Sequence, residues 1–133
     1  MSEESVVIVN GARTPMGGLM GSLSAVPATE LASTAVAATI ERSGIDAGSI
    51  DEVFMGCVLP AGLKQCPARQ AAIGAGIPVS AGAVTVNKAC GSGMQATIFA
   101  FDSIMEPVYS ACFRGNSFVR TKGSNGQPAN GAS

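Results

Sequence analysis

The chain has 133 residues, of which 47% are apolar and 13% are charged, and its net charge is −1. This composition is typical of a folded domain with a buried core and excludes a disordered chain. The near-neutral charge gives no reason to expect a nucleic acid or a membrane surface as partner. The acidic N-terminus, Met1-Ser2-Glu3-Glu4, lacks the basic start of a signal peptide, so we expect a cytoplasmic protein.

Strand and helix signals alternate three times along the chain, which predicts an α/β fold with a mostly parallel sheet. The first strand is β-branched without alternation, which favours a central strand covered on both faces. In the first helix Thr29 is a candidate cap and Gly44 a candidate stop, and Pro67 suits the first position of the second helix. The predicted strands are 5–10, 50–58 and 83–87, and the predicted helices are 29–43, 68–75 and 92–104.

Two further segments stand apart from this alternation. Prolines and glycines predict a loop over 13–27. From 105 to 133 the chain is rich in Gly, Ser and Asn, which predicts a flexible tail. The helix expected over 92–104 has almost no polar face, so we expect it to lie inside a larger protein.

The four cysteines, Cys57, Cys66, Cys90 and Cys112, have neither metal-type spacing nor the pattern of a disulfide framework, so reduced thiols and no metal site are expected. We expect Cys57 to lie in the core of the second strand. The chain contains no histidine. Because histidine is the usual base for a cysteine nucleophile, any base that serves a thiol here is another group.

Cys90 lies at a predicted corner between a strand and a helix, in the segment "VTVNKACGSGM". Its neighbours Ala89 and Gly91 are small, as a sharp turn with unusual φ and ψ requires. A thiol at a helix N-terminus is easier to ionise, because the free N–H groups and the helix dipole favour negative charge. The alternative is that Cys90 is a small buried core residue.

Three segments, "NGARTPMGG", "CPARQAAIGAGIP" and "VNKACGSGMQA", resemble segments of the thiolase family in the order expected for it. The resemblance implies a thiolase-like layered fold, of which the chain holds an incomplete N-terminal β-α-β-α-β-α half-domain at 1–104, followed by a divergent tail at 105–133. It also implies that the first strand lies inside the sheet, between the second strand and later strands, and that the third strand is an edge.

By this resemblance Cys90 is the catalytic nucleophile of an acyltransferase that forms or cleaves acetoacetyl-CoA or other 3-ketoacyl-CoA through a cysteine acyl-enzyme. Coenzyme A thioesters are then substrates, no cofactor is bound permanently, and a homo-oligomer is expected. The family's histidine and second cysteine belong to a C-terminal half that this chain lacks, and Cys112 lies in no such motif. We therefore expect the chain alone to be inactive.

Other interpretations stay open beside this one. The chain could be a non-catalytic truncated or spliced product that associates with a full-length thiolase subunit, or a ketosynthase-like condensing enzyme of related fold. A papain-like protease is disfavoured, because no histidine is present and Gly93-Met94 departs from that pattern. Cys66 replaces the family's Asn before Pro67, and the lost cap would cost about 1 kcal/mol. Arg69 and Lys88 could contact a CoA phosphate, although single basic residues are more often structural.

Overall fold

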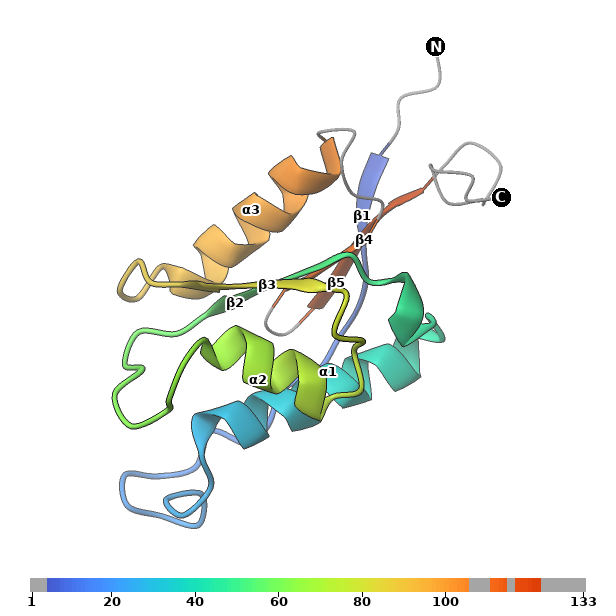
Figure 1. Ribbon diagram of the computed structural model, residues 1–133. Coiled ribbons are helices and arrows are strands. Elements are labelled where there is room, and N and C mark those ends of the chain that lie inside the picture. The colour runs from blue at the N-terminus through green and yellow to red at the C-terminus, as the bar shows by residue number, and fades with distance from the viewer. Residues whose placement is uncertain (1–4, 106–110, 115–116, 123–133) are drawn as a thin grey trace.

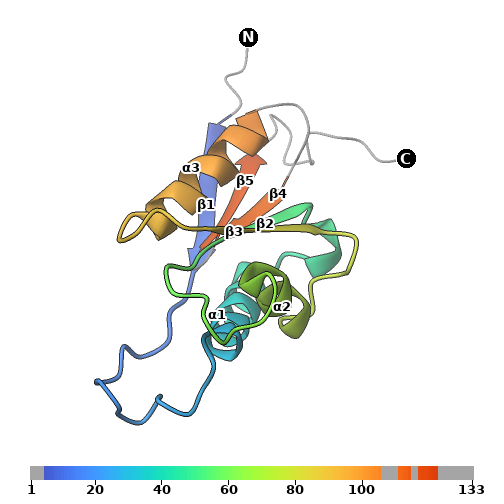
Figure 2. The same ribbon diagram turned by 60° about the vertical axis from the view of Figure 1, so that its left-hand side comes forward.

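A computed structural model describes residues 5–105, 111–114 and 117–122 of the chain. The described strands form one five-stranded sheet, with helices on both of its faces (Figure 1). Helices α1 and α2 lie against one face and α3 lies against the other, as the turned view also shows (Figure 2). None of the described helices combines the length and the hydropathy that crossing a bilayer requires. The predicted layered α/β fold is confirmed.

The three predicted strand and helix pairs are all present, with ends that differ by a few residues from those predicted. The strands are β1 Ser5–Gly11, β2 Glu52–Gly56, β3 Gly82–Val86, β4 Ala111–Arg114 and β5 Ser117–Lys122; the helices are α1 Ala28–Ser43, α2 Pro67–Gly74 and α3 Ser92–Met105, with a short 3₁₀ turn at Ala47–Ser49. The segment between β1 and α1 is a loop, as predicted.

The ends of α1 follow the prediction on one side only. Gly44 has φ 66° and donates its N–H to the carbonyls of Ile40 and Glu41, so the predicted glycine stop is confirmed. At the other end the capping position is Pro27, which makes no side-chain cap, and Thr29 lies inside the first turn. The predicted Thr29 cap is therefore wrong. Pro67 begins α2, as predicted.

The sheet has the order β1-β5-β4-β2-β3. β2 pairs in parallel with β3 and with β4, whereas β5 is antiparallel to both β4 and β1. The prediction that β1 is an inner strand next to β2 is therefore wrong, because β4 and β5 lie between them. β1 is an edge of the described sheet, and Ile8 is 61% exposed there. β3 forms the other edge of the described sheet, as predicted.

β4 and β5 lie in the segment 105–133, for which the composition predicts a flexible tail. That expectation is wrong for these two strands, and the remainder of 106–133 lies outside the described residues. The segments "ACFR" and "SFVRTK" are short and lie in a stretch rich in Gly, Ser and Asn, so their sequence signal is weak. Pairing with β2 on one side and β1 on the other supplies their backbone hydrogen bonds and fixes them as strands.

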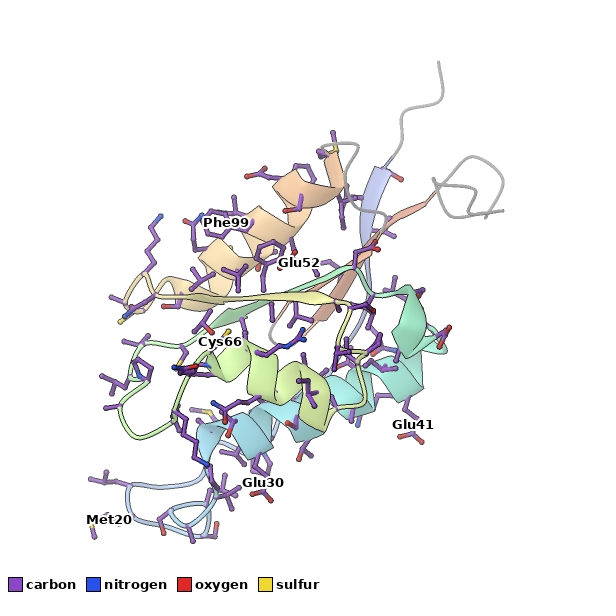
Figure 3. All side chains as sticks on the ribbon, viewed as in Figure 1. Met20, Glu30, Glu41, Glu52, Cys66 and Phe99 are labelled. Atoms are coloured by element: carbon purple, nitrogen blue, oxygen red, sulfur yellow. The ribbon has the colours of Figure 1, made fainter. Side chains whose placement is uncertain are left out.

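The core has two parts, one on each face of the sheet. Val53 and Met55 of β2 point toward α1 and α2, whereas Phe54 between them points toward α3. This explains why β2 lacks a polar and apolar alternation, since four of its residues are buried. On the α3 side, Phe54 meets Phe99 edge to face, with ring centroids 6.2 Å apart (Figure 3).

α3 contacts the sheet through a stripe of mostly small residues. Its buried residues follow at intervals of four: Ser92, Ala96, Ala100 and Ile104. Small side chains allow the helix axis to lie close to the strands. Large apolar side chains on the other sides of α3 are exposed in this chain: Met94, Ile98, Phe99, Phe101 and Met105.

The N-terminus of α3 comes closest to the sheet at Gly56, the last residue of β2. A Cβ at Gly56 would lie 2.7 Å from both the Gly93 nitrogen and the Ser92 carbonyl carbon. Such contacts are too short for carbon, so a side chain at this position would push the start of α3 away. Gly56 therefore sets where α3 begins relative to the sheet.

We predict that Gly56→Ala lowers the free energy of unfolding by about 1–3 kcal/mol, because the backbone of α3 must move to admit the methyl group. Gly93→Ala is the matched control, because a Cβ there meets nothing within 4 Å and the residue is helical. We expect this control to raise stability by up to about 1 kcal/mol. Urea denaturation followed by circular dichroism measures both changes, and equal stability of Gly56→Ala and the unmodified chain would contradict the close approach.

Candidate active site

Cys90 is exposed on the connection between β3 and α3. We call residues 87–92 the Cys90 corner. α3 begins at Ser92, so the thiol lies two residues before the first helical residue. The predicted strand, cysteine and helix order is therefore confirmed, and Cys90 is not a buried core residue.

The backbone turns sharply just before the thiol. Ala89 has φ 45°, in the left-handed region that non-glycine residues seldom adopt. This conformation costs an alanine about 1 kcal/mol or more. The turn is closed by backbone hydrogen bonds from the Gly91 N–H to the Lys88 carbonyl, at 2.9 Å, and from the Ser92 N–H to the Ala89 carbonyl, at 3.1 Å. The small neighbours predicted for a sharp turn are thus present where the turn occurs.

Two side chains support the corner from either side. Asn87 accepts the Ala89 N–H through Oδ1 at 3.1 Å and donates from Nδ2 to the Val58 carbonyl at 3.2 Å. Ser92 is 4% exposed, and its hydroxyl accepts the Lys88 N–H at 2.9 Å and donates to the Ala89 carbonyl at 2.6 Å. Analysis of the sequence did not identify either residue. The signal for Asn87 was the preference of Asn for bonding the backbone two residues on.

The basic residues considered for phosphate contact both have protein partners. Arg69 donates to the carbonyls of Ala81 and Val79, at 2.5 and 2.6 Å, and so holds the segment that leads into β3. Lys88 donates from Nζ to Gln95 Oε1 at 2.8 Å, which joins the corner to the first turns of α3. The Arg69 contacts are structural, whereas Lys88 is exposed and its ammonium keeps two further donors, so a phosphate contact of Lys88 stays a prediction.

The other cysteines lie outside the Cys90 corner. Cys57 follows β2, is half-buried, and donates its N–H to the Val86 carbonyl at 2.9 Å, so it lies just beyond the strand in which it was predicted. Cys66 is exposed at the start of α2 (Figure 3), with φ 40° and no side-chain cap. Its Sγ lies 3.7 Å from Thr85 Oγ1. Cys112 lies on β4, and its side chain is outside what the structure describes.

Cys66 shows why the family's Asn suits this position. Asn tolerates a left-handed backbone better than Cys does, and its side chain can cap a helix. The Cys66 side chain makes no cap, and the cost of a lost cap inferred from the sequence stays a prediction.

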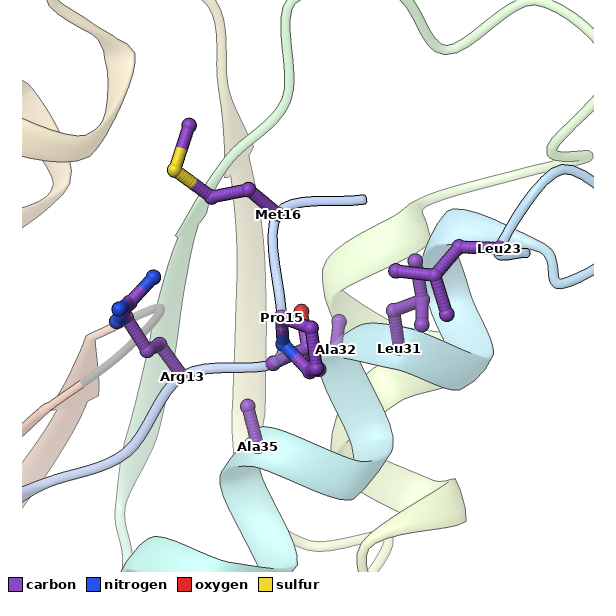
Figure 4. Close-up of a pocket in the computed structure, with 8 residues that line it drawn as sticks. Arg13, Pro15, Met16, Leu23, Leu31, Ala32 and Ala35 are labelled. Atoms are coloured by element: carbon purple, nitrogen blue, oxygen red, sulfur yellow. The ribbon is translucent and has the colours of Figure 1, made fainter. Parts of the chain in front are cut away.

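A cavity of about 530 Å³ lies elsewhere, between the loop that follows β1 and the first half of α1 (Figure 4). It is lined by Arg13, Thr14, Pro15, Met16, Leu23, Leu31, Ala32 and Ala35. This lining holds no thiol and no residue of the Cys90 corner. Among the described residues, no three side chains of metal-binding type lie together. Of the two exposed thiols, Cys66 and Cys90, that of Cys90 lies on the connection into α3.

Comparison with known proteins places this arrangement in a family. The model of the family "Thiolase, N-terminal domain" matches residues 6–114. Acetyl-CoA acetyltransferase 2 from Arabidopsis thaliana is 54% identical over 104 residues, which cover 78% of this chain and 26% of that protein. Mitochondrial acetyl-CoA acetyltransferase from Homo sapiens is 48% identical over 102 residues, which cover 77% and 24%.

Solved structures agree with these matches. Acetyl-CoA acetyltransferase from Syntrophomonas wolfei superposes with a TM-score of 0.79 at 40% identity, over 82% of this chain and 28% of that one. Acat5 thiolase from Ascaris suum, in complex with coenzyme A, superposes with a TM-score of 0.80 at 34% identity over the same shares. The chain spans about a quarter of the length of the curated relatives. Since the family model covers most of the sequence, the chain belongs to the thiolase family, in the part that forms the N-terminal domain.

Proposed function

We propose that this chain is the nucleophile-bearing domain of a thiolase-type acyltransferase, in which Cys90 accepts the acyl group of a coenzyme A thioester. The observation that carries the proposal is the exposed thiol on a left-handed turn immediately before α3. Relatives with about 50% sequence identity are named acetyl-CoA acetyltransferases, and the Ascaris suum thiolase was solved with coenzyme A. The substrate class proposed is therefore acetoacetyl-CoA or another 3-ketoacyl-CoA.

The chemistry is the transfer of an acyl group to the Cys90 sulfur. With a simple acyl-CoA, the sulfur attacks the thioester carbonyl, the bond between that carbonyl carbon and the CoA sulfur breaks, and CoA leaves with a proton. With a 3-ketoacyl-CoA, the sulfur attacks the 3-keto carbon, the bond between C2 and C3 breaks, and acetyl-CoA leaves after C2 takes up a proton. The thiol proton of Cys90 passes to a base. This chain has no histidine to take it, so the base of a complete enzyme comes from residues outside this chain.

The compartment also stays a prediction. The acidic N-terminal residues favour a cytoplasmic protein, whereas several relatives are named mitochondrial.

A second candidate function is supported by the exposed apolar surface of α3. In this alternative the chain is a non-catalytic domain that associates with a full-length thiolase subunit or with further copies of itself. Five large apolar side chains of α3 are exposed, and Met94 is 67% exposed. The two edges of the described sheet, β1 and β3, offer unpaired backbone groups beside them.

The first prediction concerns thiol reactivity. We expect limiting iodoacetamide to modify Cys90 before Cys57, because Cys90 is exposed at the helix start and Cys57 is half-buried. Peptide mass mapping after short reaction times measures the order. The same order should disappear in urea, which serves as the control, and equal labelling of both thiols in the folded chain would refute the proposed nucleophile.

The second prediction concerns turnover. The chain alone is expected not to cleave acetoacetyl-CoA in the presence of CoA, since it has no histidine base. Loss of the enolate absorbance of acetoacetyl-CoA is the measurement, with a full-length thiolase as positive control. Steady cleavage that Cys90→Ser abolishes would mean that another residue of this chain acts as the base.

The third prediction concerns association. We expect the purified chain to be oligomeric, because exposed large apolar side chains on one helix are costly in water. Multi-angle light scattering gives the mass. Phe101→Ser should shift the mass toward a monomer, whereas Asp102→Ser on the same helix should not, since Asp102 is polar already. A monomer of the unmodified chain would contradict association through α3.

A further inference from the structure

The Ser92 hydroxyl bonds outside the helix that it begins. A serine that caps a helix accepts an N–H from the second or third residue of that same helix. Ser92 instead accepts the N–H of Lys88 and donates to the carbonyl of Ala89, both of which precede α3. The hydroxyl therefore spans the left-handed turn and holds it from the side of the buried core.

The Ser92 hydroxyl spans Ala89, the residue of this turn whose backbone is strained. Ala89 has φ 45°, and both of its backbone polar groups are bonded to side chains, the N–H to Asn87 and the carbonyl to Ser92. The Ser92 N–H also donates to this carbonyl, at 3.1 Å, and closes the turn. Without the two side-chain bonds, the strain of its positive φ would favour relaxation of Ala89 toward an ordinary right-handed or extended conformation. Such a relaxation would rotate the next residue, Cys90, away from the start of α3.

Ser92 itself cannot readily follow a moving corner. It is 4% exposed, and the first of the buried residues that hold α3 on the sheet. Gly56 lies so close to it that a Cβ on Gly56 would be 3.0 Å from the Ser92 Cβ. The hydroxyl is thus fixed by the packing of α3 against β2, and it passes that rigidity to the turn.

We infer that Ser92 is a positioning residue for the Cys90 thiol: its hydroxyl fixes the left-handed conformation of Ala89 and so keeps the thiol at the start of α3. Asn87, which is exposed, holds the same turn by accepting the Ala89 N–H. The inference rests on the proposed role of Cys90 as a nucleophile, and it adds the residues that make the thiol reactive. It also explains why a serine, with both a donor and an acceptor on one atom, occupies a buried position.

The test measures the second-order rate constant of iodoacetamide with Cys90 in the full chain, divided by that of a synthetic peptide of residues 84–94. The peptide has the same local sequence without the fold. We expect a ratio of roughly three or more in the unmodified chain, because the fold holds the exposed thiol beside the first N–H groups of α3, whereas the flexible peptide does not. Ser92→Ala should lower the ratio to about one, and Ser92→Thr, which keeps the hydroxyl, should retain most of it.

Ala89→Gly in the Ser92→Ala background separates positioning from simple stability. Glycine adopts the left-handed conformation freely, so the double variant should regain the higher ratio without the hydroxyl. A general loss of helix stability would not be repaired at Ala89. Ser33→Ala is the matched control, because the Ser33 hydroxyl, like that of Ser92, bonds two backbone groups, here the carbonyls of Thr29 and Ala71, but on the opposite face of the sheet. It should leave the ratio unchanged.

The outcomes distinguish the two proposals. A ratio of one in the unmodified chain would refute the activated nucleophile and the positioning role with it. A high ratio that survives Ser92→Ala, or that Ala89→Gly does not restore in the Ser92→Ala background, would overturn the positioning role alone. If circular dichroism shows that Ser92→Ala does not fold, Asn87→Ala takes its place. Asn87 is exposed, and its substitution removes the bond from the Ala89 N–H. An unchanged ratio in Asn87→Ala would equally overturn the inference.

Discussion

The close contact between α3 and the end of β2 determines most of what this chain can do. Gly56 has no side chain, so the backbone at Ser92 and Gly93 can approach it, and Ala96 and Ala100 continue the contact along the helix. A helix that lies this close to the sheet leaves little length for the connection from β3. The chain must therefore turn within a few residues, and that turn forces Ala89 into the left-handed region. The exposure of Cys90 follows from the packing and not from the cysteine itself.

Cysteine catalysis requires a nucleophile, a base and a substrate pocket, and the described residues do not bring these three together. The fold supplies an exposed thiol before a helix N-terminus, together with hydrogen bonds that hold the turn. It supplies no histidine, and the cavity of about 530 Å³ beside Arg13 and α1 is lined by no residue of the corner. Nucleophile, base and substrate pocket are thus different requirements, and this domain, about a quarter of the length of its relatives, holds an exposed thiol at a helix start without a histidine.

The sequence predicted the elements whose signals are local. Gly44 and Pro67 mark helix ends by their own backbone preferences, and the position of Cys90 between a strand and a helix followed from the pattern around it. It did not predict β4 and β5, because their strand conformation depends on partners far away in the chain. The edge position of β1 was missed for the same reason. The roles of Ser92 and Asn87 could not be predicted, since the direction of a hydroxyl or an amide depends on the tertiary position of the turn.

The position of the hairpin β4–β5 has a consequence for how the chain folds. β1 is made first, yet the strand with which it pairs is β5, and Ser5 lies opposite Lys122. Contacts between such distant residues carry a large entropy of loop closure and are slow to form. During synthesis the helices can pack on β2 and β3 before β5 is made. Until then, β1 has no partner strand in the described sheet. The Val-rich strand β1 is thus the last strand to pair. Until β5 has been made, β1 can pair with a wrong strand.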